Sequence, residues 1–567
     1  RIDRILVRQR EHFKKILLVG NIVVVLVLLV GLAACATQAP PEPTAAPEAA
    51  PTEAVAEAEP TEVPPTEAPP EPTEVPPTDV PPTEVPPTEA PPQPTELRVG
   101  ISLDVESMDP FFVNQAAGWS VVHALFDHLI ERDFEGDIVP GLALSWTTVG
   151  TATLEFALRD DVTFHNGEPF TAESVKFSVE RMLAEEEAPN QGKFTAIDSV
   201  EVVDDYTVRL NLNRPDGTLF DSLTSRLAML PPKYFEEVGA EGFAEAPVGT
   251  GPFSFVEWMP DDHVTLVANE SYWDGSYKGK PQVDTVVFRP IPEAATRMAE
   301  LQSGGVNIIQ DVLPDQMDDL DASGLNVVAD EAFQLQYVFL IADDETLPTY
   351  DVRVRQALNY AVDVDAIIEN LLAGLGSHIA SPIGPGYLGY DPDVAPYEYD
   401  PEKAKALLAE AGYADGFETT LDSTTAGHTD VIDAVAGYLA EVGVDVAVQD
   451  YELGQFNQNW MDHAQSMLWG ARWGNTPDPQ SIELFASCNG WITRYCNEDV
   501  TMHLEAARDT LDQDARAEHY AAASQLMHDD PLAIYLNTAA QIYGLGSGVE
   551  NFQPSPLLAI IVSGVSV

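Results

Sequence analysis

Residues 158–175 read LRDDVTFHNGEPFTAESV, a stretch that contains a turn and the start of a helix. The His-Asn-Gly triplet at 165–167 is typical of a tight turn, because glycine adopts positive φ without steric cost. Thr171 precedes apolar residues at helical spacing, Val175 and Val179 among them, so it is placed to cap that helix. The stretch therefore predicts a turn followed by a capped helix, and its residues belong to the scaffold more than to a ligand site.

Downstream of this stretch, strand-like and helix-like patterns alternate along the chain. Asp400 and Pro401 precede a helical segment at 402–411, and Gly412 follows it, which is the order of residues that helices use at their two ends. Residues 417–448 have the pattern strand, helix, strand. We therefore predict a βαβ unit and an α/β fold with an open sheet.

Eight segments, in this order, resemble one family, the solute-binding proteins of peptide- and nickel-type ABC importers, known as family 5. Each segment is weak alone, but eight in register form a strong pattern. The segments are residues 107–110, 122–129, 158–175, 248–253, 269–273, 354–363, 404–417 and 477–479.

The resemblance implies a two-lobed periplasmic-binding-protein-like fold of type II, with an extra subdomain and a hinge between the lobes. We expect lobe I at 97–342 with the inserted subdomain at about 141–246, lobe II at 343–531, and a return to lobe I at 532–567. Closure on a ligand would be a hinge motion.

The first 34 residues are typical of a lipoprotein signal peptide. Basic residues between Arg8 and Lys15 precede an apolar run at 16–34, which ends in Leu-Ala-Ala directly before Cys35. This arrangement resembles the lipobox of bacterial lipoproteins. We expect export, acylation of Cys35 and anchoring on the outer face of the cytoplasmic membrane. An ordinary transmembrane anchor is the alternative, because about 20 apolar residues cross a bilayer.

Residues 35–96 comprise Cys35 and a low-complexity tract of near-repeated Pro-Pro-Thr-Glu pentads. The tract lacks aromatic residues and is rich in proline and acids, so it cannot build a core. We expect a disordered, extended stalk between the anchor and the folded part.

The charge balance excludes nucleic acid as a partner. The chain has 92 acidic and 28 basic residues, a net charge of -64. Phosphate binding requires clustered Lys and Arg, which the folded part at 97–567 lacks. An acidic surface tuned to salty surroundings is the simplest explanation, and an acidic field that attracts cationic ligands is the alternative.

Cys488 and Cys496 are the two cysteines that remain after Cys35. In an exported protein a close pair of this kind indicates a disulfide. Closing so short a loop stabilises the fold by about 2.5 kcal/mol on a chain-entropy estimate. We expect no metal site and no cofactor, because the nearest histidine, His503, has no partner at ligand spacing.

Catalytic motifs are missing from the sequence, and we predict that the chain is not an enzyme. It contains no Gly-x-Ser-x-Gly elbow, phosphate-binding loop or His-Glu-x-x-His pair. The pairs His123 and His128, or His519 and His528, are more typical of core or surface residues than of ligands. A pair of glycosidase carboxylates stays open as an alternative among so many acids.

The expected pocket departs from the peptide-binding relatives. In those proteins a tryptophan lies shortly before an Asp-Pro pair, and an aspartate three residues before the pair binds the ligand's ammonium group. Residues 469–479 read WGARWGNTPDP, with Asn475 at the acidic place. Arg472 stands where the aromatic residue is expected, and Trp473 follows it. The connection at 422–429 also lacks the arginine that takes a dipeptide carboxylate, so a free dipeptide finds neither familiar anchor.

The remaining candidates suit a hydroxyl-rich or weakly charged ligand. Aromatic faces and a few convergent polar groups make a typical small-molecule site. Arg472 would bind either an acidic ligand group or a neighbouring carboxylate. For Trp119 and Trp469 the alternative to stacking on a ligand is burial in the core. The predicted stacking surfaces are Trp119, Trp469 and Trp473, and the predicted hydrogen-bonding groups are Gln115, His428 and Asn475.

Together these features predict a monomeric, lipid-anchored substrate-binding protein of an ABC importer. It would capture a peptide-like or oligosaccharide solute between its lobes and deliver it to permease and ATPase subunits on other chains. Two alternatives remain, a stalked extracellular glycoside hydrolase and a solute receptor used only for sensing.

Overall fold

The structure of the protein is a computed structural model that describes residues 94–567, apart from 425–428, 463–467, 475 and 491–493. The described residues belong to one compact unit, which spans Ala90–Val567. The predicted signal peptide, the acylated Cys35 and nearly all of the predicted stalk lie outside the described residues. Within the described part, no helix is both long enough and apolar enough to cross a bilayer.

Two long strands, β12 (Asn326–Leu340) and β16 (Ala533–Leu545), pair with each other within the folded unit. We name its two lobes by the ranges expected from the sequence, 97–342 with 532–567 for lobe I and 343–531 for lobe II. The other elements of lobe I are β1 (Glu96–Ile101), η1 (Pro110–Phe112), α2 (Ala116–Leu125), β2 (Ile130–Arg132), β3 (Ile138–Pro140), β4 (Ala143–Val149), β5 (Thr153–Leu158), α3 (Ala172–Ala184), η2 (Gln191–Phe194), β6 (Ile197–Asp204), β7 (Thr207–Leu212), α4 (Leu219–Ser225), α5 (Pro232–Glu245), β8 (Phe253–Met259), β9 (His263–Ala268), β10 (Thr285–Pro290), α6 (Ala294–Ser303), β11 (Ile308–Ile309), η3 (Pro314–Gln316) and α7 (Met317–Ala322). Those of lobe II are η4 (Pro348–Tyr350), α8 (Val352–Tyr360), α9 (Val364–Leu371), α10 (Pro401–Glu410), β13 (Phe417–Thr424), α11 (Thr429–Glu441), β14 (Val444–Tyr451), α12 (Leu453–Met461), β15 (Leu468–Trp473), η5 (Pro479–Ile482), α13 (Glu483–Ala486), α14 (Glu498–Arg508) and α15 (Gln513–Asp529).

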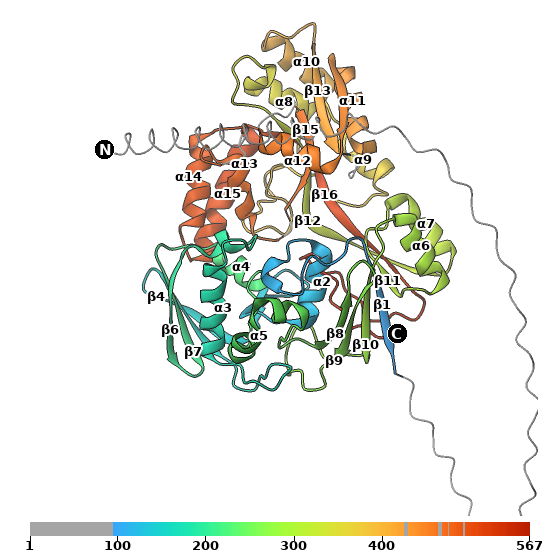
Figure 1. Cartoon of the computed structure of the whole chain (residues 1–567). Helices are drawn as coiled ribbons and strands as arrows, with labels where there is room; N and C mark the ends of the chain where they lie inside the picture. The colour runs from blue at the N-terminus through green and yellow to red at the C-terminus, as the bar shows by residue number, and fades with distance from the viewer. Residues whose placement is uncertain (1–93, 425–428, 463–467, 475, 491–493) are drawn as a thin grey trace, which may run out of the picture. The chain divides into compact units, whose positions relative to one another are not determined.

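A ten-stranded sheet runs through both lobes in the order β14-β13-β15-β12-β16-β11-β1-β10-β9-β8. Figure 1 shows the paired strands β12 and β16 passing between the lobes. The C-terminal part of β12 pairs with β15 of lobe II, whereas the C-terminal end of β16 pairs with β11 of lobe I. These two strands therefore connect the part of the sheet expected for lobe I with the part expected for lobe II.

The stretch at 158–175 forms the predicted turn and helix. Gly167 has φ +85°, and the backbone N–H of Phe164 donates to the carbonyl of Glu168 at 2.8 Å across the turn. Thr171 occupies the N-cap of α3, and its backbone N–H donates to the hydroxyl of Ser174 at 3.3 Å. α3 packs against β6 of a separate antiparallel sheet, β4-β5-β7-β6, which falls inside the range expected for the extra subdomain.

The predicted βαβ unit is confirmed in lobe II. β13 and β14 are parallel neighbours, and α11 connects them. Asp400 caps α10 as predicted, because its carboxylate accepts a hydrogen bond from the backbone N–H of Lys403 at 2.9 Å. Pro401 is the first residue of that helix, and Gly412 follows it with φ +96°.

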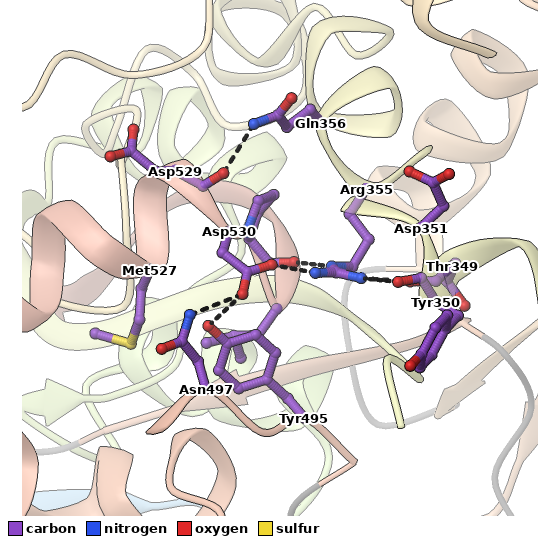
Figure 2. A network of polar contacts seen from close by, with 12 residues as sticks. Thr349, Tyr350, Asp351, Arg355, Gln356, Tyr495, Asn497, Met527, Asp529 and Asp530 are labelled. Carbon is purple, nitrogen blue, oxygen red and sulfur yellow. Dashed lines mark hydrogen bonds and ion pairs between the residues drawn. The ribbon is translucent and has the colours of Figure 1, made fainter. Parts of the chain in front are cut away.

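Arg355 of α8 ties that helix to the end of α15 and the start of β16 (Figure 2). Its guanidinium donates to the carbonyls of Thr349, at 2.7 Å, and Pro531, at 2.8 Å, and pairs with the carboxylate of Asp530. The second oxygen of Asp530 accepts from Tyr495 at 3.2 Å and from Asn497 at 2.9 Å. We call Arg355, Asp530, Tyr495, Asn497 and these carbonyls the lobe II network.

The C-terminal segment after β16 packs on lobe I. Ala559 and Ile560 are buried in the same apolar core as Leu97 of β1. The backbone N–H of Ile560 donates to the hydroxyl of Ser120 in α2 at 2.9 Å. Lobe II has its own apolar cores on the two sides of the crossing strands. Cys488 and Cys496 are joined by a disulfide in lobe II.

Candidate functional site

A cavity of about 260 Å³ lies where the crossing strands meet α2 and the segment after β11. Lobe II contributes apolar side chains, Leu372 and Leu375, and lobe I contributes residues of α2 and of the segment 310–314 after β11. The cavity therefore lies at the junction of the lobes. Its polar lining consists largely of carboxamides, Gln115, Gln310, Gln334, Asn537 and Gln541.

Two of these amides stand on β16, a strand that is otherwise largely apolar. The Nδ2 group of Asn537 donates to the carbonyl of Thr538 at 2.7 Å. Its Oδ1 atom is buried and has no hydrogen-bond partner among the described residues. Gln541, four residues later, accepts a hydrogen bond from the Tyr543 hydroxyl. Asn537 and Gln541 thus place carboxamide side chains of β16 in the wall of the cavity.

Lobe I supplies the opposite wall. The side-chain amide of Gln310 donates to the Ser102 hydroxyl at 2.8 Å and contacts the Asp311 carboxylate at 3.2 Å. Asp311 has φ +56°, a left-handed conformation that aspartate tolerates better than most residues. Gln115 is the N-cap residue of α2, and its side chain is exposed at the cavity.

Carboxamides donate and accept hydrogen bonds without carrying charge, so this lining suits an uncharged polar ligand. Asp311 is the one acidic residue among the described residues that line the cavity. A glycosidase needs two carboxylates across the bond that it cleaves. The described lining thus does not supply the carboxylate pair that the glycoside hydrolase alternative requires.

The structure separates the two predicted site residues of lobe I. Gln115 lines the cavity, but Trp119, one turn further along α2, is 4% exposed and belongs to the lobe I core. The guanidinium of Arg226 lies over the Trp119 ring at 4.3 Å. Burial lowers the pKa of Arg226 to about 10, although the carboxylate of Asp221 opposes that shift. Arg226 thus takes the position above the ring where a stacked ligand was predicted, and the role of Trp119 in binding stays a prediction.

The remaining predicted site residues belong to lobe II. His428 and Asn475 lie outside the described residues. Trp469, Arg472 and Trp473 stand on β15 opposite Phe339, Gln336 and Leu335 of β12, and their side chains are outside the description. Their roles stay predictions.

The Asp-Pro pair at 478–479 has a structural role. The Asp478 carboxylate caps η5 by accepting from the backbone N–H of Gln480 at 3.1 Å, and it pairs with Arg516 at 2.8 Å. Gln480 also donates to Asp221 of lobe I at 2.7 Å, and Asp221 pairs with Arg132 at 2.9 Å. Residues next to the Asp-Pro pair thus connect the two lobes directly.

Sequence reasoning missed the carboxamides of the crossing strands and of the segment after β11. A signal for them existed, because Asn537 and Gln541 interrupt an otherwise apolar strand pattern. No local pattern connects them with Gln310, which comes from a distant segment and reaches the cavity through the pairing of β11 with β16.

Comparison with known proteins gives consistent matches over the folded part. Residues 137–492 match the family model described as bacterial extracellular solute-binding proteins, family 5 Middle. Heme-binding protein A of Haemophilus influenzae is 31% identical over 490 residues, which cover 78% of this chain and 87% of that protein. The dipeptide-binding protein of Escherichia coli is 29% identical over 471 residues, with 76% and 87% covered. The solved structure of HbpA2 from Haemophilus parasuis has a TM-score of 0.73 at 27% identity and covers 83% of this chain and 99% of that one.

Proposed function

Because the chain belongs to the bacterial extracellular solute-binding proteins of family 5, as its sequence segments indicated, we propose that it captures a peptide-like or oligosaccharide solute between its lobes for an ABC importer. Proteins of this family bind solutes and are not enzymes, and they deliver the solute to permease and ATPase subunits. The cavity at the crossing strands carries the proposal, because both lobes and both joining strands line it.

The cavity lining supports an uncharged, hydrogen-bonding solute. Five carboxamides line the cavity together with one carboxylate. Carboxamides can hydrogen-bond to a peptide backbone or to sugar hydroxyls, and neither of these needs a fixed counter-charge. Among the relatives, the dipeptide-binding protein of Escherichia coli supports the peptide-like choice.

Further parts of the proposal come from the sequence. Lipid attachment at Cys35 would hold the protein at the outer face of the cytoplasmic membrane, and the proline-rich stalk at 35–96 would give the binding unit reach. The protein would act as a monomer. A receptor used only for sensing is the alternative, and neighbouring genes for permeases and ATPases would favour transport.

The first test is a thermal-unfolding screen of the purified full-length chain against peptides and oligosaccharides. A solute at 100 times its dissociation constant raises the unfolding free energy by about 2.7 kcal/mol, which such a screen detects. Stabilisation by a member of either class supports the proposal. No stabilisation by any peptide or oligosaccharide would contradict it.

Two variants then locate the bound solute. Gln115→Ala removes one hydrogen-bonding group from the cavity, so we expect the dissociation constant of the hit to rise about 3- to 10-fold. Gln525→Ala is the matched control, because Gln525 is an exposed amide on α15 and is not part of the cavity lining. Equal effects of the two substitutions would exclude the cavity as the binding site.

A further inference from the structure

A group of three buried potential metal ligands lies in lobe I, apart from the cavity. His123 lies near the end of α2, His128 follows that helix, and Glu131 stands on β2. Their exposed fractions are 2%, 0% and 1%. One donor atom from each residue can be chosen so that the three atoms lie within 4.8 Å of one another. None of the three residues lines the cavity between the lobes.

Most of the donor atoms in this group lack a partner among the described residues. Both ring nitrogens of His123, Nε2 of His128 and Oε2 of Glu131 are buried without a hydrogen bond. A buried polar atom without a partner costs about 1–3 kcal/mol, so native proteins rarely leave several together. Four such atoms on three neighbouring residues indicate that something binds there.

The ring orientation of His128 also suits a metal ligand. Oε1 of Glu131 accepts a hydrogen bond from the backbone N–H of His128 at 2.9 Å, and Nδ1 of the ring lies 3.3 Å from the same oxygen. The 3.3 Å between Nδ1 and Oε1 is close to the spacing of two donors around a tetrahedral zinc ion, so both atoms can bind the same ion without a large movement.

The surrounding charges leave room for a cation. The ammonium group of Lys278 contacts the carbonyl of Phe126 at 2.9 Å, Asp127 at 2.8 Å and Oε1 of Glu131 at 3.3 Å, so all three of its N–H groups are used. One buried ammonium thus serves two buried carboxylates. A further positive charge would balance the second carboxylate.

We propose that His123, His128 and Glu131 form a site for a zinc ion inside lobe I. Two imidazole nitrogens and one carboxylate oxygen are a donor set that zinc takes, with water as the fourth ligand. In a tetrahedral zinc site donors lie about 3.3 Å apart, so small side-chain rotations close the group around the ion. Because the three side chains are buried, the ion enters as lobe I folds and exchanges slowly.

The test is to unfold the full-length chain, remove metals with a chelator, and refold it with zinc or with cobalt(II) as a coloured substitute. After desalting, we expect one tightly held metal ion per chain by elemental analysis. Cobalt should give the intense visible absorption of a four-coordinate site. A refolded chain that holds no metal, or cobalt with only the weak absorption of an octahedral surface ion, would overturn the proposal.

Variants separate this site from the other close histidine pair. His128→Asn removes a ligand, and we expect metal retention to fall at least about 10-fold. His519→Asn is the matched control, because His519 is half-exposed on α15 and contacts His503 of α14 at 3.1 Å. Loss of the ion in His519→Asn, with retention in His128→Asn, would overturn the assignment. If His128→Asn does not refold, Glu131→Gln and the cobalt spectrum of the unaltered chain decide the question.

Discussion

Lobes I and II each bury a polar network, but only one of the two is complete. In the lobe II network, Arg355 donates to carbonyls on two segments and Asp530 receives donors on both oxygens. In lobe I, Lys278 and Asp127 are fully bonded, yet the adjacent His123, His128 and Glu131 leave four atoms without partners among the described residues.

The difference shows how structural and ligand-directed polar groups can be distinguished. A complete network fixes the position of one segment against another, as Arg355 fixes α8 against the start of β16. In an incomplete network some hydrogen bonds hold the side chains in place, but other buried polar atoms lack the partner that would offset the free-energy cost of burying them. The same contrast marks Asn537 in the cavity, whose amide N–H is bonded while its oxygen is free.

The largest expected effect is in lobe I. Lys278→Met leaves the carboxylates of Asp127 and Glu131 buried without their cation, so we expect the unfolding free energy to fall by about 3–5 kcal/mol. Guanidinium-induced unfolding measures it. Lys280→Met is the control, because Lys280 forms an exposed pair with Asp274 and its loss should cost less than about 1 kcal/mol. Equal losses in the two variants would show that the lobe I group is not a tight network.

The next effect concerns the complete network. Arg355→Met removes the donors to the carbonyls of Thr349 and Pro531 and the partner of Asp530, which is itself partly exposed. We expect the unfolding free energy to fall by about 2–3 kcal/mol, by the same amount with and without zinc. Arg353→Met, which breaks an exposed pair with Asp351, is the control. If zinc restored the stability of Arg355→Met, the two networks would not be independent.

The unfolding free energy should also depend on pH through the lobe I carboxylates, with a smaller effect than that of the two substitutions above. Burial alone would raise the pKa of Asp127, but the Lys278 ammonium and the donors from Trp273 and Tyr272 hold it below its ordinary value. Its stabilising contribution is therefore present above the unfolded pKa, near 3.9, and is lost as the pH falls through the lower folded value. We expect the unfolding free energy below about pH 4 to fall by up to about 1.4 kcal/mol per pH unit more than in Asp127→Asn. Parallel pH profiles would contradict this assignment.

The smallest effect is expected on the surface. His519→Asn changes a half-exposed contact with His503, so the unfolding free energy should change by less than about 0.5 kcal/mol. Thermal unfolding of the two proteins side by side measures it. A large loss of unfolding free energy would mean that the surface pair stabilises the fold as well as the buried group.

Local signals predicted much of the scaffold. Asp400 and Pro401 start α10 as expected, and Thr171 stands at the N-cap of α3. Such features depend on residues within a few positions of one another, so the sequence displays them directly. The two-lobed fold was predicted from the resemblance of eight segments to family 5, because no local sequence pattern indicates it.

The sites were less predictable, because they form between distant segments. Gln115 was predicted and lines the cavity, but Gln310 and Asn537 meet it only through the pairing of β11, β16 and β12. His123 and His128 are five residues apart, a spacing with no metal signature in a helix. The chain leaves α2 between them, which brings both beside Glu131.

The most direct test of the zinc site is anomalous diffraction at the zinc edge from crystals of the full-length chain refolded with zinc. We expect one strong anomalous peak enclosed by His123, His128 and Glu131. Water or empty density between these side chains, with the anomalous signal absent or confined to the surface pair of His503 and His519, would contradict it.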